Sequence, residues 1–149
     1  MSAVLAHPAR RCARQTCARV VRLALAAERA HGLPGGLLVA VAGAESGWRP
    51  SVMGWRRGRG RRGCDVGVAQ IHVPDCLPHL VRLIRPLGEN LRAGAYLLMR
   101  SRERCAAPAP PAACRRCPAA LYNSGSATWC GRVQAIRRAL LAPQEVPGA

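Results

Sequence analysis

The chain has 149 residues, of which 23 are basic and 7 acidic, so its formal net charge is +16 at pH 7. A hydrophobic content of 50% with 20% charged residues excludes disorder of the whole chain, and the longest apolar run, residues 33–44, is too short to span a membrane. A chain of this size can bury about two-thirds of its surface, so we expect one domain spanning 1–149. The basic excess predicts an anionic partner: nucleic acid, a membrane surface or an acidic wall polymer.

The first half of the chain is predicted to form two helices followed by an irregular β region. Residues 10–31 group apolar side chains against many Arg, as a surface helix does. After a Gly-Leu-Pro stop, residues 35–45 form an almost wholly apolar helix, which must therefore be buried. No helical period holds over 47–73, which favours short strands and turns. Within that region, the Arg-Gly-rich segment 56–62 is expected to be a solvated loop.

The next predicted elements are two helices and a loop. Asp75 is a candidate N-cap for a helix that runs to about Arg85, with a proline tolerated in its first turn. A longer helix spans about 89–104. The Pro-rich segment 107–112 ends it and is expected to be a loop rather than a linker, because too few residues follow to build a second core.

The last predicted elements are a helical turn at 118–123 and a final helix at about 127–141. Ser126 is expected to cap this helix. Its inner face is predicted to comprise Val133, Ile136, Leu140 and Leu141. The sequence thus predicts five or six helices with one small irregular β region, which is an α+β, mostly α fold.

Eight cysteines, at positions 12, 17, 64, 76, 105, 114, 117 and 130, form an even set. Four disulfides are one possibility. A zinc site is another, because Cys114 and Cys117 have the Cys-x-x-Cys spacing of a ligand pair. A four-cysteine zinc site usually uses two such pairs, and only one is present, so the spacing favours disulfides.

Glu45 is the most informative single residue. A carboxylate at the end of a buried apolar helix is desolvated and faces the negative end of the helix dipole, and both effects favour its protonated form. A carboxyl group kept neutral near pH 7 is suited to general acid catalysis. The alternative is a glutamate exposed to solvent at a helix end.

Glu45 begins an ordered series of short motifs. They are Glu-Ser-Gly-Trp at 45–48, Asp-Val-Gly-Val-Ala-Gln-Ile at 65–71, Glu-Asn-Leu-x-x-Gly-Ala-Tyr-Leu at 89–97 and Leu-Tyr-Asn-Ser-Gly at 121–125. From about residue 37 to 141 this series resembles the lysozyme-like superfamily. The resemblance is closest to soluble lytic transglycosylase domains, including those associated with secretion systems or phages. It implies a lysozyme-like fold, with residues 1–36 as an N-terminal helix and lead-in.

The resemblance also implies a reaction. Glu45 would protonate the glycosidic oxygen between N-acetylmuramic acid and N-acetylglucosamine in peptidoglycan. It would then act as a base toward the sugar's own 6-hydroxyl, which closes a 1,6-anhydro ring. No cofactor and no metal are expected.

The other site residues follow from the same resemblance. Gln70, Ile71 and Asn123 would lie along the bound substrate, and Tyr122 would lie close to the catalytic carboxyl. Ser46 belongs to the same site, where we expect it to support the structure around Glu45 rather than act as a nucleophile, because no histidine is placed by sequence to activate it.

Asp65 leaves the type of reaction open. Animal-type lysozymes share the Glu-Ser and Asp-x-Gly-x-x-Gln-Ile elements, and their Asp is the second carboxylate of a hydrolase. A hydrolase requires its carboxyl groups about 5–5.5 Å or about 6.5–9.5 Å apart, according to stereochemistry. Asp65 is therefore a candidate catalytic residue of a muramidase, with a turn cap as its alternative role. His72 departs from the Asn or Met that relatives often carry, and no second ligand at metal spacing accompanies it.

A hypothesis from a different class is an Arg-rich, zinc-stabilised nucleic-acid-binding module. The pI of about 11.5 and the Cys114/Cys117 pair motivate it. An aromatic content of 3% argues against platforms for base stacking, and such a module leaves the Glu45 motif series unexplained.

The expected partner is therefore the glycan strands of peptidoglycan, with a secretion-system or phage assembly as a further possibility. Disulfides would place the protein in the periplasm or the cell wall. The apolar stretch 20–27 is interrupted by Arg22 and is not typical of a secretion signal, so release by lysis or an unusual export route is expected.

Overall fold

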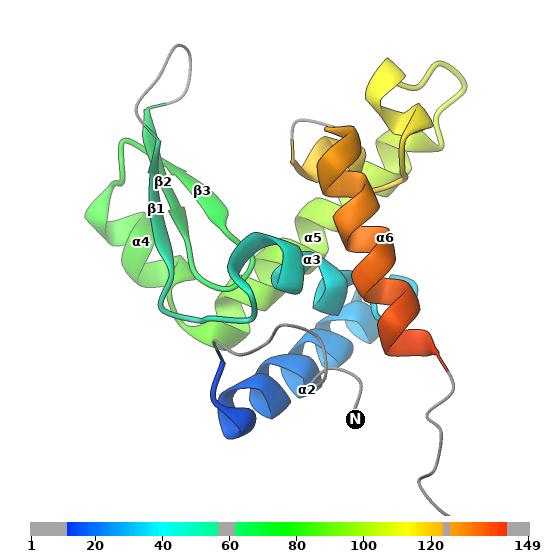
Figure 1. The fold of residues 1–149 in the computed structure, drawn as a ribbon. Helices are drawn as coiled ribbons and strands as arrows, with labels where there is room; N and C mark the ends of the chain where they lie inside the picture. The colour runs from blue at the N-terminus through cyan, green and yellow to red at the C-terminus, as the bar shows by residue number, and fades with distance from the viewer. Residues whose placement is uncertain (1–11, 57–61, 124–125, 143–149) are drawn as a thin grey trace, which may run out of the picture.

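The computed structural model describes residues 12–56, 62–123 and 126–142. Within them, five α-helices, two short 3₁₀ helices and one three-stranded sheet form the regular structure (Figure 1). In chain order these elements are α2 (Arg14–Ala30), α3 (Leu37–Ser46), β1 (Met53–Arg56), β2 (Gly63–Val66), β3 (Ile71–Pro74), α4 (Pro78–Ile84), α5 (Leu87–Cys105), η1 (Ala112–Arg115), η2 (Ala120–Tyr122) and α6 (Ala127–Leu141). The predicted α+β, mostly α class is confirmed. Most of the predicted Arg-Gly loop, residues 57–61, lies outside the described residues.

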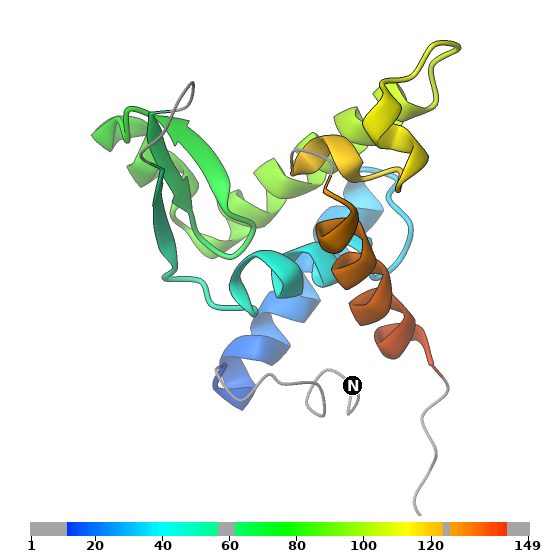
Figure 2. The ribbon, with the colours of Figure 1, turned by 45° about the horizontal axis from the view of Figure 1, so that its top comes forward.

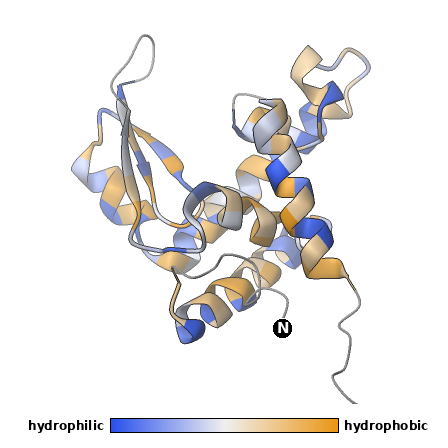
Figure 3. Ribbon diagram, in the orientation of Figure 1, coloured by the Kyte–Doolittle hydropathy of each residue, from blue (hydrophilic) through white to orange (hydrophobic). Residues whose placement is uncertain are grey.

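Helix α3 is the central element of the fold. It packs against α2, α5 and α6, and Figure 2 shows the sheet and α6 on two different sides of it. All residues from 37 to 42 are buried, as its apolar sequence predicts. The surrounding helices are amphipathic instead, and Figure 3 shows hydrophobic and hydrophilic residues alternating along α2 and α6.

The N-terminus of α3 is capped by a buried side chain of α2. Glu28 is only 1% exposed, and its carboxylate accepts hydrogen bonds from the backbone N–H groups of Gly36, Leu38 and Val39 at 2.8, 2.7 and 3.1 Å. The first turn of a helix has no internal partners for its N–H groups, and Gly36 has no side chain to supply one. A negative charge at this end also matches the helix dipole.

Burial raises the pKa of Glu28 above its ordinary value of 4.5, and the three N–H groups and Arg137 lower it by less. Burial therefore disfavours the charged form of Glu28, even though its hydrogen bonds fix the start of α3. Because its pKa differs between the folded and unfolded states, the free energy of unfolding depends on the ionisation of Glu28.

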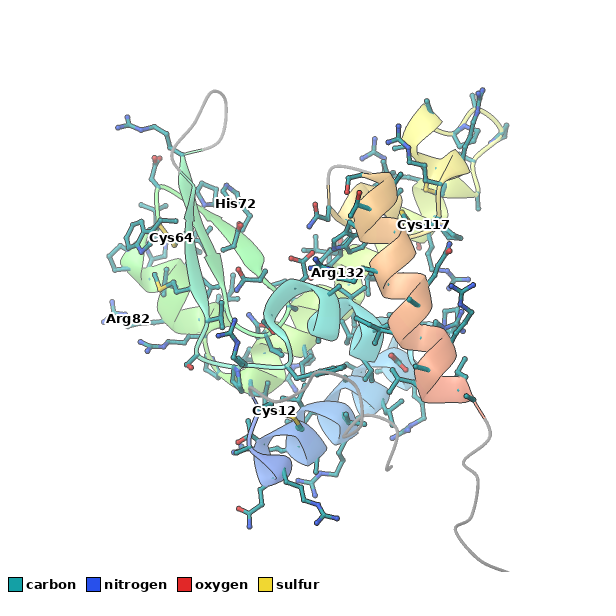
Figure 4. The ribbon with its side chains drawn as sticks, viewed as in Figure 1. Cys12, Cys64, His72, Arg82, Cys117 and Arg132 are labelled. Atoms are coloured by element: carbon teal, nitrogen blue, oxygen red, sulfur yellow. A yellow bond between two sulfur atoms is a disulfide. The ribbon has the colours of Figure 1, made fainter. Side chains whose placement is uncertain are left out.

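The sheet is antiparallel, with strand order β1-β2-β3. Successive side chains on a strand point to opposite faces, and the register aligns Gly54, Asp65 and His72 in one row across the three strands. The opposite face, which carries Cys64 and Val73, packs on α4. Figure 4 shows Cys64 and His72 on opposite sides of the sheet. The sheet thus has one face for packing and one that carries Asp65 and His72.

All eight cysteines form disulfides, which confirms the prediction of disulfides and contradicts a zinc site built on Cys114 and Cys117. The pairs are Cys12–Cys17, Cys64–Cys76, Cys105–Cys114 and Cys117–Cys130. One of them closes the predicted Pro-rich loop, and another joins β2 to the turn before α4. Such a set is typical of proteins that fold in oxidising compartments.

Two predicted details are wrong. Asp75 does not cap α4: Leu77 precedes the helix and Pro78 starts it, while Asp75 lies in a positive-φ turn after β3, next to the disulfide at Cys76. Leu141 is 60% exposed, because the buried face of α6 ends at Ile136. The cap at Ser126 is confirmed, since its hydroxyl accepts a hydrogen bond from the N–H of Trp129 at 3.0 Å.

No described helix combines the length and the apolar character that a bilayer crossing demands.

Replacing Glu28 with Gln should destabilise the fold by about 1–3 kcal/mol, because an amide turns a donor toward at least one buried N–H of α3. Denaturant unfolding measures this loss. Glu89→Gln is the matched control, since Glu89 is half-exposed and pairs with Arg92 on the surface of α5, where a pair contributes about 0–1 kcal/mol. Equal effects of the two substitutions would contradict the capping role.

The same substitution should change how stability depends on pH. Because the folded pKa of Glu28 is raised above 4.5, the folded state holds this proton more tightly, so its contribution is fully present below pH 4.5 and is lost as the pH rises through the folded pKa. The unfolding free energy of the wild type should fall over this window relative to that of Glu28→Gln. Parallel pH profiles of the two proteins would show that Glu28 does not titrate differently on folding.

Candidate functional site

Glu45 lies in the last turn of α3 and is held by two side chains from distant parts of the chain. Its Oε1 accepts hydrogen bonds from Nδ2 of Asn123 and from Nε1 of Trp129, both at 2.7 Å. Asn123 directly follows η2, and Trp129 lies in the first turn of α6. The end of the buried helix, a 3₁₀ turn and a second helix therefore converge on one carboxylate, which fixes the direction in which it points.

Tyr122 lies between this carboxylate and the sheet. Its ring stacks on that of Trp129, with centroids 6.0 Å apart, and its hydroxyl donates a hydrogen bond to the carbonyl oxygen of Ala69 at 2.6 Å. Burial raises the pKa of Tyr122 strongly, and the negative charges of Glu45 and Asp65 raise it further. The charges of both predicted catalytic carboxylates therefore act on this one phenol.

The first turn of α6 is held firmly where it meets Glu45. Ser126 caps the helix, and Cys130, the residue after Trp129, is bonded to Cys117. About one turn after Trp129, Nη1 of Arg132 donates a hydrogen bond to the carbonyl oxygen of Ala44 at 3.2 Å; Figure 4 shows Arg132 between α6 and α3. These contacts set the position of the Trp129 donor relative to α3.

Ser46 joins α3 to the turn that precedes β3. Its hydroxyl oxygen lies 2.8 Å from the carbonyl oxygen of Val68 and 3.0 Å from that of Ala42, and it accepts a hydrogen bond from the N–H of Arg49. The side chain is buried. Ser46 is therefore a buried structural link between α3 and this turn.

The turn at residues 67–70 is braced from two sides. Nε2 of Gln70 donates hydrogen bonds to the carbonyl oxygens of Gly67 and Val52 at 2.8 and 3.2 Å. From α5, Asn90 accepts a hydrogen bond from the N–H of Ala69 and donates one to the carbonyl oxygen of Val66, both at 2.8 Å. A Cβ on Gly67 would lie 2.5 Å from the Asn90 amide, so the close contact requires glycine there.

These contacts determine which atoms of the predicted substrate-binding residues remain available to a ligand. The NH₂ group of Gln70 is committed to the turn, which leaves its amide oxygen near Gly54. Ile71 is buried in the core and its side chain has almost no surface for a ligand. Among the described residues that were predicted to form the site, Asn123 bonds Glu45, and Tyr122 precedes Asn123 and bonds the carbonyl oxygen of Ala69, the residue before Gln70.

Asp65 is on the face of the sheet opposite α4 and pairs with its cross-strand neighbour. Its Oδ1 lies 3.0 Å from Nδ1 of His72. The Asp65 side chain is 8% exposed and that of His72 is 28% exposed. The carboxylate is therefore largely covered, and the imidazole is the more accessible member of the pair.

Sequence reasoning missed two residues that shape this site, Trp129 and Asn90. A signal existed for Trp129: it lies three residues after the predicted cap Ser126, in a chain with only three tryptophans. Asn90 lies within the 89–97 motif but received no role. Its paired acceptor and donor act on a turn more than twenty residues earlier in the chain, a contact that no local pattern indicates.

No group of three or more His, Cys, Asp or Glu side chains within 12–56, 62–123 and 126–142 is arranged to hold a metal ion. Comparisons of the chain with protein-family models, with curated proteins and with solved structures each found no match. The likeness to lytic transglycosylases therefore rests on the residues of the motif series.

Tyr122 offers a direct test of the geometry around Glu45. In a Tyr96→Phe variant it is the sole tyrosine, since the chain has two. Because its pKa is raised above the ordinary 10.0, its phenolate absorbance should be absent from the folded protein at pH 10 and should appear only as the protein unfolds at higher pH. An alkaline titration followed by near-ultraviolet absorbance and circular dichroism checks this; phenolate formation before loss of structure would contradict the buried position.

Proposed function

We propose that the protein is a peptidoglycan lytic transglycosylase, and that Glu45 is its acid and base. The observation that carries this proposal is the carboxylate at the end of the buried helix α3, aimed by Asn123 and Trp129. The ordered motifs from Glu45 to Asn123 supply the substrate class by resemblance.

In this mechanism Glu45 donates its proton to the glycosidic oxygen as the bond from that oxygen to the sugar C1 breaks. The positive charge that develops at C1 is captured by the same sugar's 6-hydroxyl oxygen, which forms the 1,6-anhydro ring. The hydroxyl proton returns to Glu45, so the enzyme ends in its starting state. Because a single group serves as acid and then as base, a fixed orientation of its carboxylate is essential.

The environment of Glu45 supports this assignment. Tyr122 is kept protonated by its raised pKa and its hydroxyl is committed to Ala69, so it shapes the site without competing as a base. Trp129 and Asn123 both donate to Oε1 of Glu45, and these two contacts restrict the orientation of the carboxylate. Glu45 is thus the side chain that we expect to transfer the proton.

A muramidase that uses Glu45 and Asp65 is the second candidate. The observation in its favour is that both carboxylates raise the pKa of Tyr122. Against it, Asp65 is largely covered and bonded to His72, whereas a nucleophile or a base for water must reach its target. The zinc-stabilised nucleic-acid module loses its metal ligands to the disulfides.

The cellular setting that we propose is the periplasm or the cell wall, with a secretion-system or phage assembly as a further context. The four disulfides support an oxidising compartment. The arginine excess would hold the enzyme on the anionic wall by long-range attraction.

Glu45→Gln should abolish cleavage of purified peptidoglycan, with a loss of at least about 100-fold, because the amide cannot transfer the proton. Trp129→Phe keeps an aromatic ring against Tyr122 and removes one donor, so a smaller loss of about tenfold is expected. Turbidity clearing measures both, and Glu89→Gln on the surface of α5 is the control for folding and charge. Full activity of Glu45→Gln would overturn the proposal.

Mass spectrometry of the digested wall separates the two candidate reactions. Products with 1,6-anhydro ends are expected for the transglycosylase, and products with reducing ends would instead establish the muramidase.

Adsorption to purified walls should fall steeply as salt rises, because screening shortens the range of electrostatic attraction from about 10 Å at 0.1 M to about 3 Å at 1 M ionic strength. Pelleting walls with the Glu45→Gln protein measures binding without digestion. Adsorption that is independent of salt would show that the +16 charge does not hold the protein on the wall.

A further inference from the structure

The Asp65–His72 pair is built into the sheet rather than formed by chance at its surface. The two residues are directly opposite on β2 and β3, and Nδ1 of His72 lies 3.0 Å from Oδ1 of Asp65. Neighbouring cross-strand side chains are close enough to bond directly. The register of the sheet therefore determines the pairing.

Glycines lie next to both members of the pair. A Cβ on Gly63 would lie 2.3 Å from the carbonyl oxygen of Val73, 2.8 Å from Cε1 of His72 and 3.1 Å from its Nε2, so the imidazole lies against the backbone of β2 at that point. Gly54 occupies the position opposite Asp65 on β1 and adds no side chain to the row. The imidazole is thus held at its Nδ1 edge by a carboxylate and along its other edge by a bare backbone.

This contact fixes the proton on the neutral ring. An ionised carboxylate only accepts hydrogen bonds, so Nδ1 carries the hydrogen and Nε2 carries the lone pair. No described residue donates a hydrogen bond to Nε2. Nε2 is consequently an acceptor that the fold orients and leaves without a partner in the described part of the chain.

The pair and the acid of the site both act on Tyr122. The negative charges of Asp65 and Glu45 each raise the pKa of Tyr122, whose hydroxyl donates to the carbonyl oxygen of Ala69 just before β3, and Figure 4 shows His72 on the side of the sheet away from the Cys64 face. A ligand on this side would meet the half-buried imidazole before it met the covered carboxylate.

We propose that His72 is a ligand-binding residue that accepts a hydrogen bond, through Nε2, from a hydroxyl or acetamido N–H group of an amino-sugar glycan, and that Asp65 is its positioning residue. This inference rests on the proposed function for the identity of the ligand. Asp65 acts through the imidazole and does not touch the substrate, so it is not a second catalytic carboxylate. The site then has one proton-transfer group, Glu45, and a separate recognition group on the sheet.

The tautomer is tested first, without any activity. Nitrogen-15 correlation spectra of the folded protein should show the neutral His72 ring protonated at Nδ1. In Asp65→Asn, the amide can donate to Nδ1 and should shift the proton to Nε2. A wild-type ring protonated at Nε2 would overturn the inference.

Binding is tested next with oligomers of N-acetylglucosamine as the probe, in the Glu45→Gln background so that nothing is cleaved. His72→Asn retains an N–H group where Nδ1 lies but lacks Nε2, and it should weaken binding about tenfold. His72→Gln places an amide oxygen near the position of Nε2 and should restore part of the loss. Unchanged binding by His72→Asn, with a folded protein by circular dichroism, would overturn the inference.

A double-mutant cycle assigns the role of Asp65. If Asp65 acts only through His72, Asp65→Asn should weaken binding as much as His72→Asn does, and it should cause no further loss in the His72→Asn background. Additive losses would show that Asp65 contacts the ligand itself. Cleavage by the Glu45→Gln protein would refute the proposed function alone, whereas an inactive Glu45→Gln protein that binds equally well with His72→Asn would refute this inference alone.

Discussion

The capping of α3 by Glu28 is the interaction on which the rest of the structure depends. Three backbone N–H groups at the start of the buried helix, one from its N-cap residue and two from its first turn, donate to a side chain of α2, and burying them without an acceptor would cost several kcal/mol. A helix of ten residues is a rigid rod of about 15 Å. Because its start is fixed to α2, its far end, where Glu45 lies, is fixed as well.

Around that far end, the fold assigns different physical tasks to different elements. The sheet and the turn at residues 67–70 are held by Asn90 and Ser46, so they present Asp65 and His72 on a rigid face. The beginning of α6 and the end of η2 supply donors to Glu45. Apolar packing gathers these elements, and a small number of buried polar contacts determine their orientation. Such contacts are satisfied throughout the described chain, which is what allows polar groups to persist in the interior.

The sequence predicted the features that depend on local patterns. The helices at 14–30 and 127–141 follow from hydrophobic periodicity, and the helix at 37–46 follows from its almost wholly apolar sequence. The cap at Ser126 follows from its place before the last helix. Asp75 was wrongly assigned as a cap because a positive-φ turn and a disulfide override its local preference. The roles of Glu28 and the disulfide pairing could not be predicted, and the place of Trp129 beside the predicted cap gave no indication of its partner, since each contact joins residues that only the tertiary fold brings together. Trp129 and Glu45 are 84 residues apart.

The disulfide between Cys117 and Cys130 has a consequence for how the site is assembled. The bond closes a ring of chain with a sequence separation of 13, and Asn123 and Trp129, which both donate to Glu45, belong to that ring. The two residues that hold the Glu45 carboxylate therefore lie in one covalently closed segment. Oxidation of Cys117 and Cys130 restricts the conformations of Asn123 and Trp129 together. Formation of this disulfide therefore also helps to orient the Glu45 carboxylate.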